Sequence, residues 1–162
     1  MRSIRRSRWY PEAVQPWLPP NEPPADCLSD LETEHNELSV WLIDDDRANL
    51  ERVVAALASK RQSLVPFDCR LVPIGRVRQL RLQLSQTPGD SHDHEANQLW
   101  HRDLQFLSAG RLTSLSRCLW RRGESRRFSP AQVRKLLIAG IQQGRLNRDD
   151  LRPELAFKLN LD

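Results

Sequence analysis

The sequence predicts an α/β or α+β fold, in which about four helices cover a small, mostly three-stranded sheet behind a Pro-rich N-terminal arm. Three observations lead to this expectation: a strand–helix–strand pattern over residues 38–72, helical spacing of apolar residues in the C-terminal half, and prolines crowded before residue 25. The 162 residues suit one domain. We therefore expect an arm and acidic connector over residues 1–36 and a single α/β domain over residues 37–162.

The N-terminal arm is indicated by prolines that remove backbone donors and prevent a continuous helix or central strand. These prolines are Pro11, Pro16, Pro19, Pro20, Pro23 and Pro24. Trp9, Tyr10 and Trp17 are interleaved with them, and such rings favour an apolar surface to lie on. That surface is either the protein's own domain or another protein subunit that contacts residues 1–24.

The strand–helix–strand pattern begins the domain. Residues 38–43 (LSVWLI) form an apolar run typical of a strand buried on both faces. The aspartates at 44–46 supply an N-cap for a helix over residues 46–62, which has one apolar face. Pro66 ends that segment, and residues 67–72 alternate as a second strand.

The rest of the chain is predicted to be largely helical. Residues 74–84 fit a short helical turn followed by a strand at about 80–85. The Pro-Gly-Asp sequence within residues 87–93 indicates a loop. Three helices are then expected, over residues 95–107, 108–122 and 130–143. Ser108 is a candidate N-cap for the second, and the last begins with an N-cap serine and a proline.

Charge is distributed unevenly along a chain whose net charge is only +4. Residues 21–50 carry nine acids against one arginine, and residues 106–135 carry eight basic residues against one acid. Of the 25 basic residues 22 are arginine, whose planar fork of donors grips phosphate in two places. GC-rich coding sequence also favours arginine, but explains the clustering less well. The acidic stretch is interpreted as a solvated connector, with docking of a basic partner or shielding of the basic residues as alternatives.

Several classes of protein are disfavoured by absent motifs. The chain has no P-loop, no G-x-G-x-x-G turn and no G-x-S-x-G elbow, so we expect no cofactor and lean against an enzyme. Cys27, Cys69 and Cys118 stand far apart, as isolated reduced thiols do. No stretch approaches the roughly 18 apolar residues that a membrane helix needs. We therefore expect a cytoplasmic protein with no membrane partner.

The strongest candidate site is a run of arginines interrupted by one indole. Arginine for phosphates and an aromatic ring for a base are the usual equipment for binding single-stranded nucleic acid. The candidate nucleic-acid-binding residues are Arg117, Trp120, Arg121, Arg122, Arg126, Arg127, Arg134 and Lys135. The alternatives are a solvated helix face with Trp120 in the core, and an acidic protein as the partner.

Two further clusters carry candidate residues. The arm offers Arg2, Arg5, Arg6, Arg8 and Trp9 to a phosphate backbone or to a groove in a larger assembly, or it is an unstructured start.

The second is a histidine cluster. His92, His94 and His101 lie among acids and would make a metal or hydrolytic site only if they converge. A polar loop that enters a helix is the favoured interpretation, and a histidine that makes structural hydrogen bonds is the other alternative.

Taken together, the patterns favour a non-enzymatic accessory subunit that binds nucleic acid, RNA included, or a nucleoprotein complex. A small metal-dependent hydrolase or nuclease that uses the three histidines is the first alternative. A protein-interaction module whose Pro/Trp arm is the ligand is the second.

Overall fold

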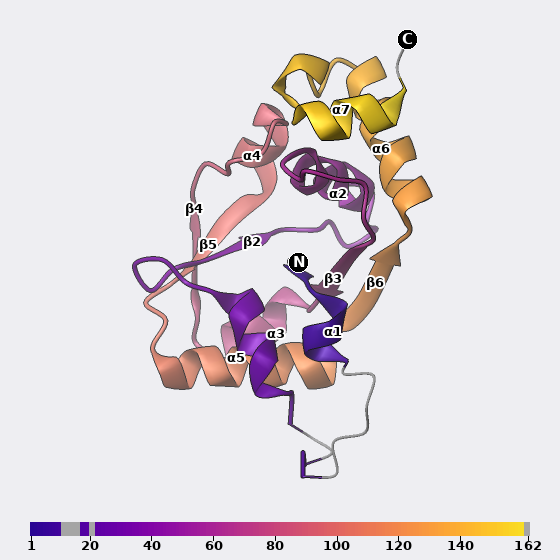
Figure 1. Cartoon of the computed structure of the whole chain (residues 1–162). Helices are drawn as coiled ribbons and strands as arrows, with labels where there is room; N and C mark the ends of the chain where they lie inside the picture. Colours follow the sequence, from indigo (N-terminus) through magenta and orange to yellow (C-terminus); the bar gives the residue numbers. More distant parts are fainter. Residues whose placement is uncertain (11–16, 20–21, 161–162) are drawn as a thin grey trace. The chain divides into compact units, whose positions relative to one another are not determined.

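The computed structural model describes residues 1–10, 17–19 and 22–160 (Figure 1). Its contacts divide the chain into two compact units. The first unit consists of Met1–Val40, Asp68–Ser85 and Asp103–Arg126. The second consists of Trp41–Phe67, Gln86–Arg102 and Arg127–Asp162.

The mixed α/β class expected from the sequence is confirmed, with the strands in two three-stranded sheets. One sheet has the order β1-β3-β6, made of β1 (Arg2–Ile4), β3 (Phe67–Leu71) and β6 (Glu124–Phe128). The other has the order β2-β5-β4, made of β2 (Leu38–Trp41), β5 (His101–Gln105) and β4 (Gln83–Gln86). The three segments expected in one sheet therefore belong to two.

The first residues of the chain are part of the first unit, where we expected an arm. β1 pairs antiparallel with β3, with Arg2 opposite Arg70 and Ile4 opposite Asp68. The short helix α1 (Arg6–Trp9) follows, and the Trp9 side chain is fully buried. A 3₁₀ helix, η1 (Ala25–Leu31), packs against α1 and β1. Burial of Trp9 explains the difference, because a large ring removed from water stabilises the segment that carries it.

The core of the first unit lies beneath two helices, α3 (Ile74–Gln79) and α5 (Ala109–Arg122). Val77 of α3 shares one buried apolar cluster with Leu115 and Leu119 of α5; Figure 1 labels both helices. Leu82 and Leu107 belong to the same cluster. The apolar spacing and the serine at 108 predicted α5. Residues 74–84 were expected to form a short helical turn followed by a strand, and they form α3 and the start of β4.

The second unit is mainly helical. α2 (Leu50–Ser59) packs against α4 (His94–Trp100) and α6 (Pro130–Gln142). Ser129 and Gln132 form a capping box at the start of α6, as the serine–proline signal predicted. The 3₁₀ turn η2 (Arg148–Asp150) and α7 (Pro153–Leu159) complete the described chain.

Two expected helices are wrong in their extent. Helix 46–62 begins only at Leu50, because the Asn49 side chain accepts from the Asp44 amide and donates to the Leu42 carbonyl, which fixes a turn where the aspartates were expected to cap.

The second error concerns helix 95–107. It ends at Trp100 and is followed by β5. The buried His101 contacts Thr87 through Nδ1 at 3.1 Å and lies edge-on to Trp41, which holds the chain extended.

Candidate nucleic-acid interface

Helix α5 presents the arginines that the sequence singled out. Ser108 caps its first turn by accepting from the Arg111 amide at 3.3 Å, and its buried leucines fix which side faces the core. Arg117, Arg121 and Arg122 then fall on the exposed side. Arg117 pairs with Glu22 at 2.9 Å.

Trp120 is partly buried and packs against the core of the first unit. Its indole packs on the rings of Trp9, with centroids 6.5 Å apart, and Tyr10, with centroids 5.5 Å apart. One alternative from the sequence placed Trp120 in the core, and the structure shows the ring partly buried against that core.

The end of α5 is held by Arg70 on β3. Its guanidinium donates to the main-chain carbonyls of Leu119 and Trp120 in the last helical turn, where carbonyls lack intrahelical partners. It also donates to the hydroxyls of Tyr10 and Ser125. Burial lowers the pKa of Arg70, but an arginine remains charged at any physiological pH. This contact fixes the turn that carries Arg121 and Arg122.

The remaining basic candidates lie on other elements than α5. Arg126 lies on β6 and pairs with Glu124 at 2.6 Å. Arg127, Arg134 and Lys135 belong to the second unit.

Arg134 has a structural role in the second unit. It donates to the carbonyls of Lys158 and Leu159, and so caps the end of α7.

Sequence reasoning missed four further arginines of the first unit. Arg76 and Arg78 are on α3, Arg81 follows it, and Arg111 is in the first turn of α5; all four are exposed. The signal was in the sequence, because residues 74–85 carry three arginines and no acid.

The pKa of Cys118 on α5 responds to arginines of both α3 and α5. Burial raises the pKa of the Cys118 thiol, and the nearby charges of Arg76 and Arg122 oppose that rise. Guanidinium groups from α3 and α5 therefore lie within electrostatic range of one thiol.

These side chains form what we call the arginine surface of the first unit. Its members are Arg76, Arg78, Arg81, Arg111, Arg117, Arg121 and Arg122. Neither α3 nor α5 contains an acidic residue. Arg76 donates to the Gln79 side chain and Arg111 to the Phe106 carbonyl, each at 3.0 Å, and neither contact neutralises the charge. Such a surface attracts polyanions.

Two of the four arginines of the predicted arm are engaged inside the first unit. Arg2 donates to the carbonyls of Asp30 and Ser39, and Arg8 to the Asp30 carboxylate. Burial lowers the pKa of Arg2, and the charges of Asp30 and Glu32 partly offset that effect.

The other arm candidates differ in exposure. Arg5 and Arg6 are exposed, and the Arg6 guanidinium lies over the Tyr10 ring. Trp9 is buried. Residues 11–16 and 20–21 of the arm lie outside the described residues.

The histidine cluster does not form a metal site. His94 is exposed on α4, His101 is buried against Thr87, and His92 is partly buried on the loop that precedes α4. Within residues 1–10, 17–19 and 22–160, no three His, Cys, Asp or Glu side chains are grouped so that they could hold a metal ion. His94 begins α4 and His101 begins β5, so the two side chains do not share a helix face.

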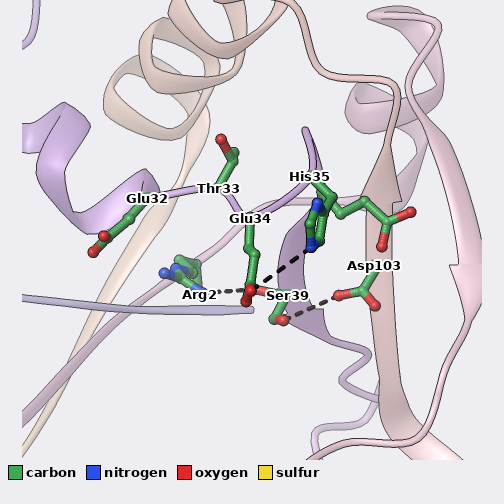
Figure 2. Close-up of a pocket in the computed structure, with 8 residues that line it drawn as sticks. Arg2, Glu32, Thr33, Glu34, His35, Ser39 and Asp103 are labelled. Carbon is green, nitrogen blue, oxygen red and sulfur yellow. Dashed lines mark hydrogen bonds and ion pairs between the residues drawn. The ribbon is translucent and has the colours of Figure 1, made fainter.

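A separate cavity of about 530 Å³ opens near the acidic stretch (Figure 2). It is lined by Arg2, Glu32, Thr33, Glu34, His35, Glu37, Ser39 and Asp103. Ser39 donates to Asp103 at 3.0 Å. With four carboxylates facing one arginine, this cavity repels phosphate, so the nucleic-acid interface does not include it.

No protein-family model, curated protein or solved structure matches the chain. Among the residues that the structure describes, no helix is both long and apolar enough to cross a membrane.

Proposed function

We propose that the first unit binds nucleic acid through its arginine surface, and that the protein serves as a non-enzymatic accessory subunit of a nucleoprotein complex. One observation carries the proposal: seven exposed arginines lie on α3, on α5 and in the turn after α3. Neither helix contains an acidic residue. Arginines clustered on one face are the electrostatic footprint expected of a nucleic-acid-binding protein.

The arrangement suits phosphate better than an acidic protein surface. Each guanidinium that neutralises a phosphate releases counterions, so several exposed arginines together supply affinity without a pocket. The arginines are carried by the helices α3 and α5 and the turn after α3, and all seven are exposed, so several of them can contact one polyanion.

A binding titration tests the proposal. Fluorescence anisotropy of labelled RNA and DNA oligonucleotides would compare the wild type with the charge-reversed pair Arg78→Glu and Arg122→Glu. We expect the reversed pair to lose most of the affinity, for all sequences alike. The matched control reverses two exposed charges on the second unit, Arg152→Glu and Lys158→Glu, and keeps most of the affinity. Equal binding by the wild type and the Arg78/Arg122 pair would overturn the proposal.

Protein subunits remain the proposed partners of residues 1–24. The observation in favour is Trp17, whose side chain is 70% exposed between prolines. Large exposed rings are enriched in protein interfaces. Trp17→Ala should weaken capture of a partner subunit and leave the affinity for oligonucleotides unchanged; a loss of oligonucleotide affinity would contradict this assignment.

A further inference from the structure

Phe106 has an unusual backbone and an exposed ring. It lies between β5 and α5, its side chain is 66% exposed, and its φ is 56°. A bulky residue in the left-handed region is an outlier, and such outliers concentrate at functional sites.

The peptide group that follows this ring is held at both of its polar atoms. The Phe106 carbonyl accepts from Arg111 at 3.0 Å. The amide of Leu107 donates to the Asn36 carbonyl at 2.9 Å, and the Leu107 side chain is buried in the core. The ring therefore projects from a fixed backbone, which lowers the entropy lost when a ligand packs on it.

Arg81 has a matching position on the neighbouring strand. Its φ is 55°, it is exposed, and it precedes the buried Leu82 just before β4, as Phe106 follows β5 and precedes the buried Leu107. β4 and β5 are neighbours in one sheet, and the side chains of Ser85 and Gln105 are hydrogen-bonded across them. The start of β4 and the end of β5 thus lie at the same end of the sheet. Arg81 and Phe106, both with a left-handed backbone and both exposed, flank these two strand ends.

From this geometry we infer that Phe106 is a stacking platform for an unpaired base, so that the nucleic acid bound by the arginine surface is single-stranded. The inference rests on the proposed function. Phe106 supplies the aromatic partner that the sequence analysis assigned to Trp120, whose ring is covered by Trp9 and Tyr10. In a duplex the faces of the bases are already stacked, so a protruding ring gains no contact there.

The test measures the affinity of the full chain for one labelled strand and for the same strand annealed to its complement, with RNA and DNA arms. The wild type should prefer the single strand. Phe106→Ala should weaken single-strand binding by about fivefold or more and leave duplex binding unchanged. Phe106→Tyr, which keeps a ring, should restore the preference, and Phe106→Leu should not.

The matched control is Phe157→Ala on α7, which removes another exposed ring, 80% exposed, and should leave both affinities unchanged. If the Arg78/Arg122 reversal abolishes binding while Phe106→Ala changes neither affinity, the arginine surface stands and the stacking role fails. Equal loss on single and double strands also contradicts it. If no oligonucleotide binds the wild type, both proposals fail.

Discussion

The indole Nε1 of Trp9 donates a hydrogen bond to the carboxylate of Asp30 at 3.0 Å, and both side chains are buried. The same carboxylate accepts from the Arg5 amide at 2.6 Å and from the Arg8 guanidinium at 3.0 Å. One acid of η1 therefore satisfies three donors from the first ten residues. These hydrogen bonds hold residues 5–9, a basic segment followed by prolines, against the core of the first unit.

Asp30→Ala should lower the free energy of unfolding by about 3 kcal/mol, because it leaves buried donors and a partly buried guanidinium without their acceptor. Urea denaturation measures the loss. Asp26→Ala, on the exposed side of the same 3₁₀ helix, should cost no more than about 0.5 kcal/mol. Equal stability of the two variants would show that Asp30 does not hold the N-terminal segment.

Two glycines of the α5 region should respond to alanine in opposite directions. A Cβ at Gly123 would lie 2.4 Å from the Leu119 carbonyl oxygen and 3.0 Å from Arg70 Nε, so Gly123→Ala should destabilise. A Cβ at Gly110 meets no atom within 4 Å, and Gly110→Ala should stabilise by about 0.5–1 kcal/mol because alanine favours the helix. Thermal unfolding tests both, and a destabilised Gly110→Ala would contradict the packing.

The ion pair between Arg52 and Asp93 should make stability depend on pH. Burial alone raises the pKa of Asp93, but hydrogen bonds from Arg52 and the Ala96 amide, with the Arg52 charge, outweigh it and hold the pKa below its ordinary value. A carboxyl whose pKa is lowered on folding contributes stability above its unfolded pKa and loses it as the pH falls through the folded one.

The stability advantage of the wild type over Asp93→Asn should therefore be constant above about pH 5 and shrink below about pH 4. Urea midpoints across this range measure it. Glu95→Gln is the control, since Glu95 meets the same Arg52 but is mostly exposed and should matter little. An advantage that grows with acid would reverse the assigned sign.

Cysteine labelling should report on the arginine surface. Burial raises the pKa of both Cys27 and Cys69 to about 11, so these thiols should resist iodoacetamide in the native protein. The partly exposed Cys118 should react first, and bound oligonucleotide should slow it because Arg76 and Arg122 lie nearby. Peptide mass spectrometry reads each site; Cys118 labelling that ignores the oligonucleotide would argue against contact there.

Local signals predicted much of the fold, and contacts distant in sequence account for the misses. The serines that precede α5 and α6 cap them as expected, because a cap involves only three or four neighbouring residues. β5 was missed because its residues are mostly polar and its partners, β2 and β4, lie elsewhere in the chain. No local pattern distinguishes such a strand from the end of a helix.

Contacts distant in sequence also explain why the candidate site could be predicted only in part. The arginines of α5 could be found from their density, but Trp120 was assigned to a ligand because its partners, Trp9 and Tyr10, are more than a hundred residues away in sequence. Arg134 was predicted to be a surface charge because its hydrogen-bond acceptor, a carbonyl at the end of α7, is distant in sequence. Phe106 gave no sequence signal, since its exposure follows from a left-handed backbone.

The dependence of oligonucleotide affinity on salt tests the central claim most directly, because it counts the phosphates that arginines neutralise. For a single strand the slope of log K against log salt is about −0.7 per contact, so four to seven arginines predict about −3 to −5. Arg78→Gln with Arg122→Gln should make the slope shallower by about 1.4, and Arg152→Gln with Lys158→Gln should leave it unchanged. A wild-type slope near zero, or the same slope in the Arg78/Arg122 variant, would contradict binding through the arginine surface.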